Sequence, residues 1–193
     1  LKIGYPVLIR PSYVLSGSAM RVAYTEAELD EYLKLAAKVS REHPAVLSKF
    51  IENAKEVEVD GVSDGEDNII GAVIEHVENA GVHSGDATMG IPSLTLDTNV
   101  LRTVKDYTHK IVEALEIRGP YNIQYLVKDG TTYVIECNLR ASRSMPYVSK
   151  TRGVNMIELA TLAMLGKKFR NSGFIDLPEI SHVGVKVPQF SFM

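Results

Sequence analysis

The sequence is poor in cysteine, in long apolar runs and in any excess of positive charge. Its one cysteine, Cys137, cannot form an internal disulfide bond. No apolar run is long enough to cross a membrane, and no signal peptide precedes the first predicted strand. The 21 basic residues stand against 24 acidic ones, whereas a general nucleic-acid binder needs a basic field to neutralise phosphates. We therefore expect a protein of the reducing cytoplasm, with Cys137 as a buried free thiol and with neither nucleic acid nor membrane as partner.

Internal repeats and low-complexity segments are also missing, so the chain is organised by ordinary helix and strand patterns. Its 193 residues suffice for one substantial domain or for a domain with a small lobe, which would bury roughly 70% of the unfolded surface. The sequence begins at Leu1 directly on a strand pattern and is typical of a piece of a longer chain. The patterns predict a small β-β-α-β lobe over residues 1–53 and a larger lobe over residues 54–193.

In the small lobe, we expect strands over residues 7–10, 21–24 and 46–50. A helix over residues 25–41 is predicted by the capping box Thr25-Glu26-Ala27-Glu28. The loop of residues 12–20 carries Gly17 at its tip and has two interpretations. It either lays backbone amides over phosphates or is a plain hairpin turn.

In the larger lobe, residues 56–62 and 69–77 predict a hairpin. Acidic residues alternate with valines along its first strand, which we interpret as a solvated face; only Glu56 is assigned a role, because it lies at the lobe boundary. A helix capped by Asp97 or Thr98 should end at Gly119 and Pro120, with Val100, Val104, Tyr107, Ile111 and Leu115 as its apolar stripe. A second helix, over residues 155–165, is apolar all round and predicts burial, and a strand is expected after Ile180.

A second hairpin, of residues 121–127 and 132–138, carries the strongest functional signal. Side chains alternate across a strand, so Val134, Glu136 and Asn138 should share one face, opposite Tyr133, Ile135 and Cys137. The turn between the strands decides which partners they meet. A two-residue Asp129-Gly130 turn would face Gln124 away from Glu136, whereas a three-residue loop with Gly130 left-handed brings them together. The apolar pattern favours the three-residue loop, with Ile123 opposite Ile135 and Tyr125 opposite Tyr133.

The predicted polar face of this hairpin suits a metal ion and a phosphate. Amide and carboxylate oxygens are the ligands that Mg²⁺ prefers, together with phosphate and water. Arg140 and Arg143 follow at once and offer guanidinium groups to a charged phosphate. A solvated outer face is the alternative, but the convergence of Asn122, Gln124, Glu136 and Asn138 with two arginines favours a site. The loop of residues 80–90, which holds His83, Ser84 and Asp86, either lines a ligand or is solvated.

Four stretches together resemble one known family. They are PSYVLSGSAM, EHVENAGVHSGDAT, NIQYLV and IECNLRASRSMPYVSKTRGV, and they are similar to the ATP-grasp module of the large subunit of carbamoyl phosphate synthetase. The resemblance covers essentially the whole chain and is closer to the carboxy-terminal, carbamate-phosphorylating half. It implies an α+β ATP-grasp fold of two lobes around a nucleotide cleft, with ATP and Mg²⁺ or Mn²⁺ as cofactors.

The resemblance also implies roles for individual residues. Gln124, Glu136 and Asn138 would bind the metal, while Arg140 and Arg143, together with Asn138, would act on the acid substrate and its acyl phosphate. The nucleotide would lie along Arg10, Gly17, Lys49, Ile51, Glu56, Gly81, Val82, His83, Ser84, Gln124 and Glu136. Two positions depart from the family pattern: Ser16-Gly17 stands for the usual Gly-Gly, and Asn138-Leu139-Arg140 for the usual Asn-Pro-Arg.

The implied partners are the remainder of the large subunit and a glutaminase subunit or domain, with carbamate and ATP as substrates. Two other interpretations remain open from the sequence. The chain could be another ATP-grasp carboxylate ligase, of the biotin carboxylase or purine-pathway type. It could also be a catalytically silent structural fragment of such an enzyme, and the isolated fragment is expected to catalyse weakly or not at all.

Overall fold

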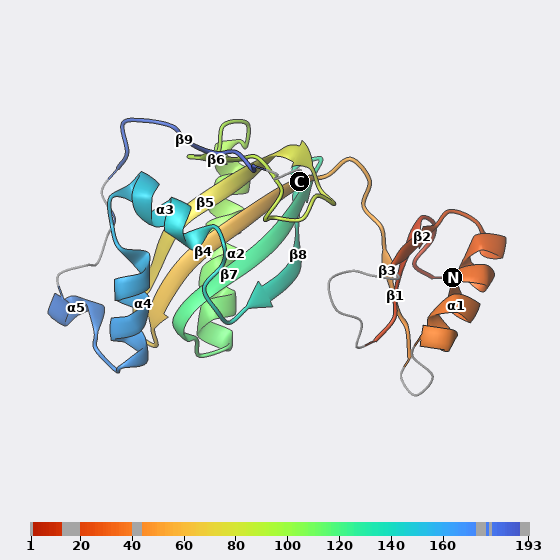
Figure 1. Cartoon of the computed structure of the whole chain (residues 1–193), viewed down its shortest axis with the longest axis horizontal. Coiled ribbons are helices and arrows are strands. Elements are labelled where there is room, and N and C mark those ends of the chain that lie inside the picture. Colours follow the sequence, from red (N-terminus) through yellow and green to blue (C-terminus); the bar gives the residue numbers. More distant parts are fainter. Residues whose placement is uncertain (1, 13–19, 40–43, 173–176, 178, 190–193) are drawn as a thin grey trace. The chain divides into compact units, whose positions relative to one another are not determined.

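The computed structural model describes residues 2–12, 20–39, 44–172, 177 and 179–189 of the chain. The chain divides into two compact units, Leu1–Glu52 and Asn53–Met193 (Figure 1). The predicted boundary lay one residue further along, after residue 53. Each unit is described by itself below. In the described part of the chain, no helix is long and apolar enough to span a membrane.

The described residues of the first unit form a three-stranded antiparallel sheet and one helix. Its strand order is β2-β1-β3, and the predicted strands differ from the observed ones by at most one residue. The capping box at the start of the helix is confirmed: the Thr25 hydroxyl accepts from the Glu28 amide, and the Glu28 carboxylate accepts from the amides of Tyr24 and Thr25. The elements are β1 (Val7–Arg10), β2 (Arg21–Ala23), α1 (Glu26–Val39) and β3 (Val46–Lys49).

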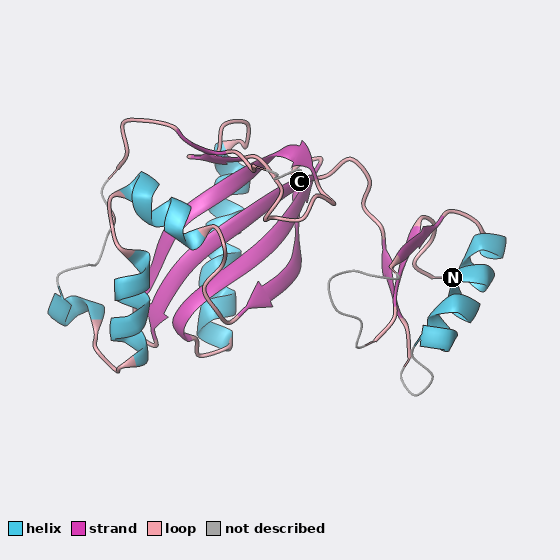
Figure 2. Cartoon of the chain, viewed as in Figure 1, coloured by secondary structure: helices cyan, strands magenta, loops and turns pink. Residues whose placement is uncertain are grey.

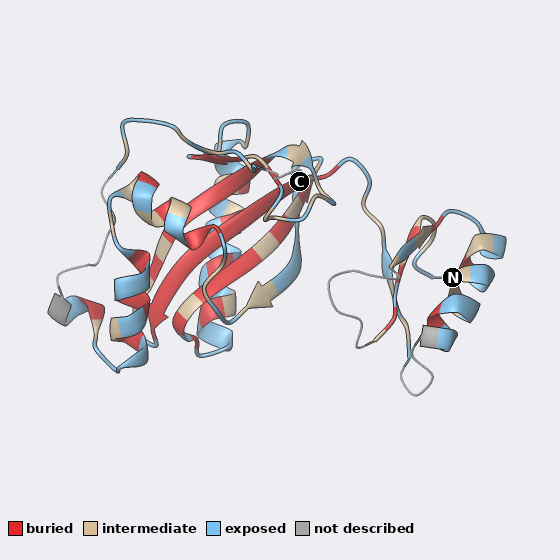
Figure 3. Cartoon of the chain, in the orientation of Figure 1, coloured by how far each residue is buried: buried red, intermediate tan, exposed pale blue. Residues whose placement is uncertain are grey.

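The second unit is built on a six-stranded sheet in the order β8-β7-β4-β5-β6-β9 (Figure 2). Every neighbouring pair in it is antiparallel. The strands are β4 (Lys55–Asp64), β5 (Asn68–Asn79), β6 (Met89–Ile91), β7 (Arg118–Lys128), β8 (Thr131–Asn138) and β9 (Gly184–Lys186). The long strands β4, β5 and β7 lie at its centre and are mostly buried (Figure 3).

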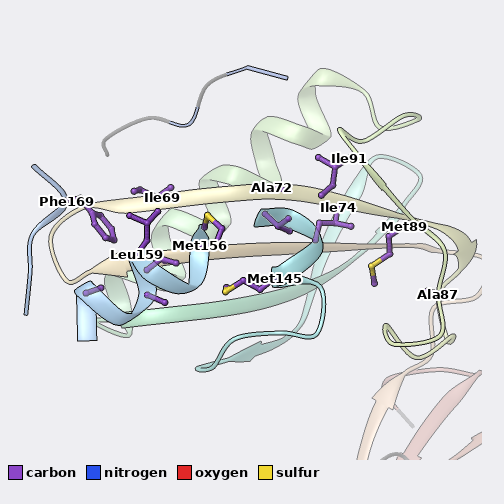
Figure 4. Close-up of a cluster of buried hydrophobic side chains, with 14 residues drawn as sticks. Ile69, Ala72, Ile74, Ala87, Met89, Ile91, Met145, Met156, Leu159 and Phe169 are labelled. Carbon is purple, nitrogen blue, oxygen red and sulfur yellow. The ribbon is translucent and has the colours of Figure 1, made fainter. Parts of the chain in front are cut away.

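Helices cover both faces of this sheet. On one face, α2 (Thr98–Ala114) packs against a core that includes Val59, Tyr121 and Ile123. On the other face, a second core joins the sheet to α3 (Met145–Arg152), α4 (Met156–Met164) and the start of α5 (Phe169–Ser172), as Figure 4 shows for Met145, Met156, Leu159 and Phe169. The half-buried Cys137, a free thiol, packs against the α2 side.

The α2 helix differs from the sequence prediction in where it ends and in which residues it buries. The α2 helix is capped by Asp97, as predicted, but ends at Ala114, and Gly119 and Pro120 belong to β7. Its buried stripe is Val100, Val104, Thr108 and Val112, whereas Tyr107 and Leu115 are exposed. Thr108 tolerates burial because its hydroxyl binds the Val104 carbonyl and the Tyr125 hydroxyl.

The helix predicted to be buried all round is buried on one side only. Ile157 and Met164 of α4 are exposed, as is Leu165 behind it. The sequence analysis assigned no helix to residues 145–152, which form the short helix α3. The expected final strand exists, but it is only the three residues of β9.

The turn predicted for the β7–β8 hairpin was wrong, and a bulge compensates for it. Lys128 pairs with Thr131, so the turn is the two-residue Asp129-Gly130 form, with both residues at positive φ (49° and 76°). The register then shifts between Gln124 and Tyr125, because Tyr125 pairs with Val134 while Gln124 pairs with Glu136. The extra residue, Ile135, forms a bulge that reverses the alternation on its strand.

The bulge therefore preserves the predicted polar face while changing the apolar pairs. Gln124 lies directly opposite Glu136, as the site required. The predicted pairs of Ile123 with Ile135 and of Tyr125 with Tyr133 are wrong: Ile123 pairs with Cys137, and Val134 takes the place opposite Tyr125.

Candidate functional site

Polar side chains form two parallel rows across strands β4, β7 and β8. Glu58 pairs with Gln124, which pairs with Glu136. Asp60 pairs with Asn122, which pairs with Asn138. Directly opposed residues of an antiparallel sheet present their side chains on the same face. The six side chains thus form one polar surface, buried at β4 and open to solvent at Glu136 on the edge strand.

The acidic residues of β4 are not the solvated face that the sequence indicated. Glu56, Glu58 and Asp60 are 7%, 1% and 0% exposed. Their strand lies in the middle of the sheet, and helices cover both faces of the sheet there. Alternation of acid and valine therefore marks two buried faces here, one apolar and one polar.

Amide groups donate hydrogen bonds to the carboxylates at the buried ends of the rows. The Nδ2 of Asn122 donates to Glu58 Oε2 at 3.1 Å and to Asp60 Oδ1 at 2.9 Å. The Nε2 of Gln124 donates to Glu58 Oε1 at 3.4 Å. Because an ionised carboxylate can only accept, each amide must turn its NH₂ group toward the acid, which leaves its oxygen for another partner.

His76 of β5 completes this buried network. Its Nε2 lies 3.1 Å from Glu58 Oε1, and both side chains are 1% exposed. Burial alone would raise the pKa of Glu58, but the hydrogen bonds from His76, Asn122 and Ser144 prevail and lower it. The ionised Glu58 therefore adds to the free energy of unfolding above the ordinary pKa of glutamate. This contribution is lost as the pH falls through the lowered pKa of Glu58.

The pKa of the two flanking acids moves the other way. Burial raises the pKa of Glu56 against the opposing effect of His76 and the Gly81 amide, and nearby Glu58 and Glu136 raise it further. Burial also raises the pKa of Asp60, although hydrogen bonds from Ser144, Ser142 and Asn122 oppose it.

Glu56, Glu58 and His76 bring one ligand atom each within 4.8 Å of one another, so the described residues place three metal-ligand groups there.

The exposed end of the rows carries the donor set predicted for a metal. Asn138 Nδ2 donates to Glu136 Oε1 at 2.8 Å. Among the described residues, this leaves the second carboxylate oxygen of Glu136 and the amide oxygen of Asn138 available, with the amide oxygen of Gln124 on the neighbouring strand. Hard oxygen donors on adjacent strands fit Mg²⁺, which takes few protein ligands and keeps water or phosphate on the others.

A third row continues the same face toward the lobe boundary. Glu56 pairs with Leu126, and Leu126 pairs with Tyr133. Leu126 is half-buried and Tyr133 is 42% exposed. The face thus offers an aliphatic and an aromatic surface beside a carboxylate, next to the oxygen donors.

The two arginines that follow β8 are exposed, and one of them contacts the loop of residues 80–90. Arg143 Nη2 lies 3.2 Å from His83 Nε2, whereas Arg140 Nη1 donates to the Ala141 carbonyl. Gly81 has a φ of 114°, which favours glycine. The half-buried Val82 packs against the α3–α4 core. The 3.2 Å contact thus brings His83 and Arg143 together.

The side chain of Lys186 on β9 binds the backbone of the loop of residues 80–90. Its Nζ donates to the carbonyls of Ser84 (2.8 Å), Gly85 (3.1 Å) and Ala87 (3.3 Å). An ammonium group has three protons, so the three carbonyls use all of them. Burial lowers the pKa of Lys186, and the aligned carbonyls supply the solvation that burial removes.

We predict that Lys186→Met loosens the loop without unfolding the unit. Methionine keeps the length and apolar character of the side chain but leaves three carbonyls without their donor. Amide exchange over residues 83–87 should accelerate at least about tenfold, the loss of roughly 1.4 kcal/mol of local stability. Lys150→Met is the control, because Lys150 is exposed on α3. Unchanged exchange in the Lys186 variant would contradict the role of this contact.

The remaining predicted nucleotide residues belong to the first unit. Arg10 is exposed at the end of β1, the Nζ of Lys49 on β3 donates to the Tyr5 carbonyl, and Ile51 follows β3. Gly17 lies outside the described residues. The structure does not place these residues relative to the polar rows of the second unit.

Sequence reasoning missed Glu58, Asp60, His76, Ser142 and Ser144 as parts of the site. The available signal was the opposition of acids on one strand by amides on the next. The alternation of acids and valines in β4 suggested a strand with one solvated face. However, Glu58 and Asp60 each lie opposite an amide of β7. This pairing indicates a buried polar network, because only buried carboxylates need fixed donors.

Comparison with known proteins places this geometry in a family. The family described as "Carbamoyl-phosphate synthase L chain, ATP binding domain" matches residues 1–171. The multifunctional protein pyrABCN of Emericella nidulans is 55% identical over 99% of this chain, which is 8% of that protein. The carbamoyl phosphate synthase large chain of Sulfolobus acidocaldarius is 53% identical over 98% of this chain and 18% of that protein. The C-terminal section of the Methanocaldococcus jannaschii large chain is 57% identical over 86% of this chain and 27% of that protein.

The chain therefore spans about a quarter or less of the length of these relatives. Among solved structures, a biotin carboxylase–β-γ-ATP complex from Campylobacter jejuni superposes with a TM-score of 0.76 over 96% of this chain and 40% of that one, at 20% identity. The ADP complex of N5-carboxyaminoimidazole ribonucleotide synthetase gives 0.72 over 86% and 43%, at 19% identity. These likenesses show the α+β ATP-grasp fold. With its family match over residues 1–171 and its relatives at 53–57% identity, the chain belongs to the carbamoyl-phosphate synthase large-chain ATP-binding family.

Proposed function

We propose that this chain transfers the γ-phosphate of ATP to carbamate, as the carboxy-terminal ATP-grasp module of a carbamoyl phosphate synthase large chain. One observation carries the proposal: the polar rows end in Gln124, Glu136 and Asn138, and Arg140 and Arg143 follow directly on the chain. The 57% identity to a relative named as a C-terminal section supports the choice of half.

Magnesium or manganese would be held by Glu136, Asn138 and Gln124. The oxygen donors left free by the internal hydrogen bonds suit either ion. The bound ion would supply positive charge between the phosphates of ATP and the acceptor. Glu58 accepts from Gln124 and Asn122 accepts from Asn138, and these contacts would fix the geometry of the site.

Nucleotide-binding roles are proposed for residues of the first unit and for residues of the second unit, each taken by itself. Glu56 would bind a ribose hydroxyl, and Leu126 and Tyr133 would offer apolar surface beside it. The loop held by Lys186 would contact the nucleotide, and Arg10 would bind its phosphates. The complete proposed set is Arg10, Gly17, Lys49, Ile51, Glu56, Gly81, Val82, His83, Ser84, Gln124 and Glu136.

In the reaction, an oxygen of carbamate attacks the γ-phosphorus while the bond from that phosphorus to the β,γ-bridging oxygen breaks, which releases ADP. Two anions must approach each other, and their repulsion in a poorly solvated site costs many kcal/mol unless cations intervene. Arg140 and Arg143 would hold the acid and the transferred phosphoryl group. No protein nucleophile is needed, because the chemistry is a direct transfer between bound groups.

The whole enzyme would supply what this chain does not. Its partners would be the remainder of the large subunit and a glutaminase subunit or domain that delivers ammonia. The location would be the cytoplasm. Carbamate and acyl phosphates hydrolyse in water, so the product would have to be protected from solvent.

The reverse reaction tests the proposal. The protein at its full natural length, supplied with Mg²⁺, ADP and carbamoyl phosphate, should form ATP, measured by a luciferase reaction. EDTA should abolish the signal, and acetyl phosphate should replace carbamoyl phosphate poorly. A protein that makes no ATP from carbamoyl phosphate, but consumes ATP in the presence of bicarbonate and biotin, would instead be a carboxylase of the biotin type.

A further inference from the structure

We propose that Asp60 is a positioning residue for Arg143. Its carboxylate binds the hydroxyl groups of Ser142 and Ser144, the two residues that flank Arg143 in the chain. The contacts of Asp60 with these two serines are called the clamp below. The role in catalysis rests on the function proposed above, whereas the clamp rests on the geometry alone. Nothing in the resemblance or in the comparisons assigns a role to Asp60.

One carboxylate oxygen holds both serines. Ser142 Oγ and Ser144 Oγ each lie 2.7 Å from Asp60 Oδ2. The other oxygen, Oδ1, accepts from Asn122 Nδ2 at 2.9 Å. Three donors on an acid that is 0% exposed satisfy it without solvent, as a buried carboxylate requires.

The clamp also fixes where α3 begins. Ser142 Oγ accepts the Met145 amide at 2.9 Å, and the Ser144 carbonyl accepts the Val148 amide at 2.9 Å. Ser144 stands at the N-cap position of α3 but makes no side-chain cap bond. Its hydroxyl is directed at Asp60 instead, which indicates that anchoring this loop outweighs capping the helix.

Arg143 is therefore held at both neighbouring residues while its own side chain stays exposed. Its guanidinium reaches His83, 3.2 Å away, from a backbone that is anchored on both sides. A side chain that must meet a phosphoryl group needs this kind of support, because a displacement of about 1 Å in such a group can lower the rate about a hundredfold.

The test compares Asp60 with Asp64, four residues along the same strand. Asp64 is 1% exposed and accepts the amides of Glu66, Asp67 and Phe169, so it is equally buried but far from the arginine loop in sequence and contacts. Asp60→Asn leaves at least one of its three donors unmatched, because an amide has one acceptor oxygen and one NH₂ group. Asp64→Asn does the same at the β4–β5 turn.

Two measurements on the full-length protein separate the outcomes. In ATP formation from ADP and carbamoyl phosphate, Asp60→Asn should raise the KM for carbamoyl phosphate about tenfold or more and change the KM for ADP less than twofold. In amide hydrogen exchange, it should accelerate residues 142–145 and leave residues 64–67 unchanged. Asp64→Asn should show the opposite exchange pattern and normal KM values.

Ser142 gives a milder pair of variants if Asp60→Asn does not fold. Ser142 is only half-buried, so Ser142→Ala should fold and raise the same KM, while Ser142→Thr keeps the hydroxyl and should restore it. Exchange and KM that stay at the wild-type level in both Asp60→Asn and Ser142→Ala would overturn the clamp. An unsubstituted protein that makes no ATP would refute the proposed function instead, and the exchange data would still decide the clamp.

Discussion

Replacing Glu136 by glutamine is expected to lower Mg²⁺-dependent ATP formation from carbamoyl phosphate at least about a hundredfold, the scale of other groups that stabilise charge in a transition state. Glutamine keeps the shape of the side chain and one oxygen, but loses the negative charge that balances the metal. Glu136 is exposed at the end of β8, so the free energy of unfolding should change by less than about 0.5 kcal/mol.

The matched control is Glu113→Gln, at an exposed glutamate of α2 on the other side of the sheet. It should retain full activity and full stability. Luciferase rates and urea unfolding of the three proteins provide the comparison. Full turnover by the Glu136 variant would show that the edge carboxylate does not hold the metal.

Replacing Gly61 by alanine is expected to destabilise the second unit by about 3 kcal/mol or more, at the upper end of overpacking effects. Gly61 pairs with Tyr121, and the phenol ring lies across it. A Cβ at Gly61 would stand 2.1 Å from the Tyr121 hydroxyl oxygen and 2.8 Å from the Ile69 carbonyl oxygen. The ring cannot easily move, because its hydroxyl donates to Asn68 Oδ1 at 2.7 Å and it lies in the α2 core.

A second strand glycine provides the comparison. A Cβ at Gly90 of β6 would come no closer than 3.5 Å to the side chain of Leu94, so Gly90→Ala should change stability by less than about 1 kcal/mol. Tyr121→Leu removes the ring, and in that background Gly61→Ala should cost much less than in the wild type. Equal costs in both backgrounds, measured by urea unfolding, would show that the ring is not what excludes a side chain.

Local signals in the sequence predicted most elements of the fold. The capping box at Thr25 and the caps at Asp97 and Asn155 are confirmed, because each depends on side chains within three residues. Where a helix turned out shorter or less buried than predicted, the cause was long-range. Thr108 could be buried only because Tyr125 supplied a partner from another strand.

The site was predicted at its exposed end and missed at its buried end. Glu136 and Asn138 stand beside arginines, and such a concentration of charge is visible in one segment. Glu58 and Asp60 acquire their meaning from Asn122 and Gln124, more than 60 residues away. The bulge at Ile135 could not be predicted either, because it depends on packing against β7 and no glycine or other turn residue stands at that position.

The short strand β9 has a consequence for where this unit can be cut. The family match ends at residue 171, yet β9 covers the outer edge of β6, and the Tyr147 hydroxyl contacts both strands at the Met89 and Gly184 carbonyls. A fragment ending at residue 171 would keep every proposed metal ligand. It would also expose the main chain of β6 as a template for pairing with other molecules. The stretch matched by the family model is thus shorter than the piece expected to keep the edge of β6 covered.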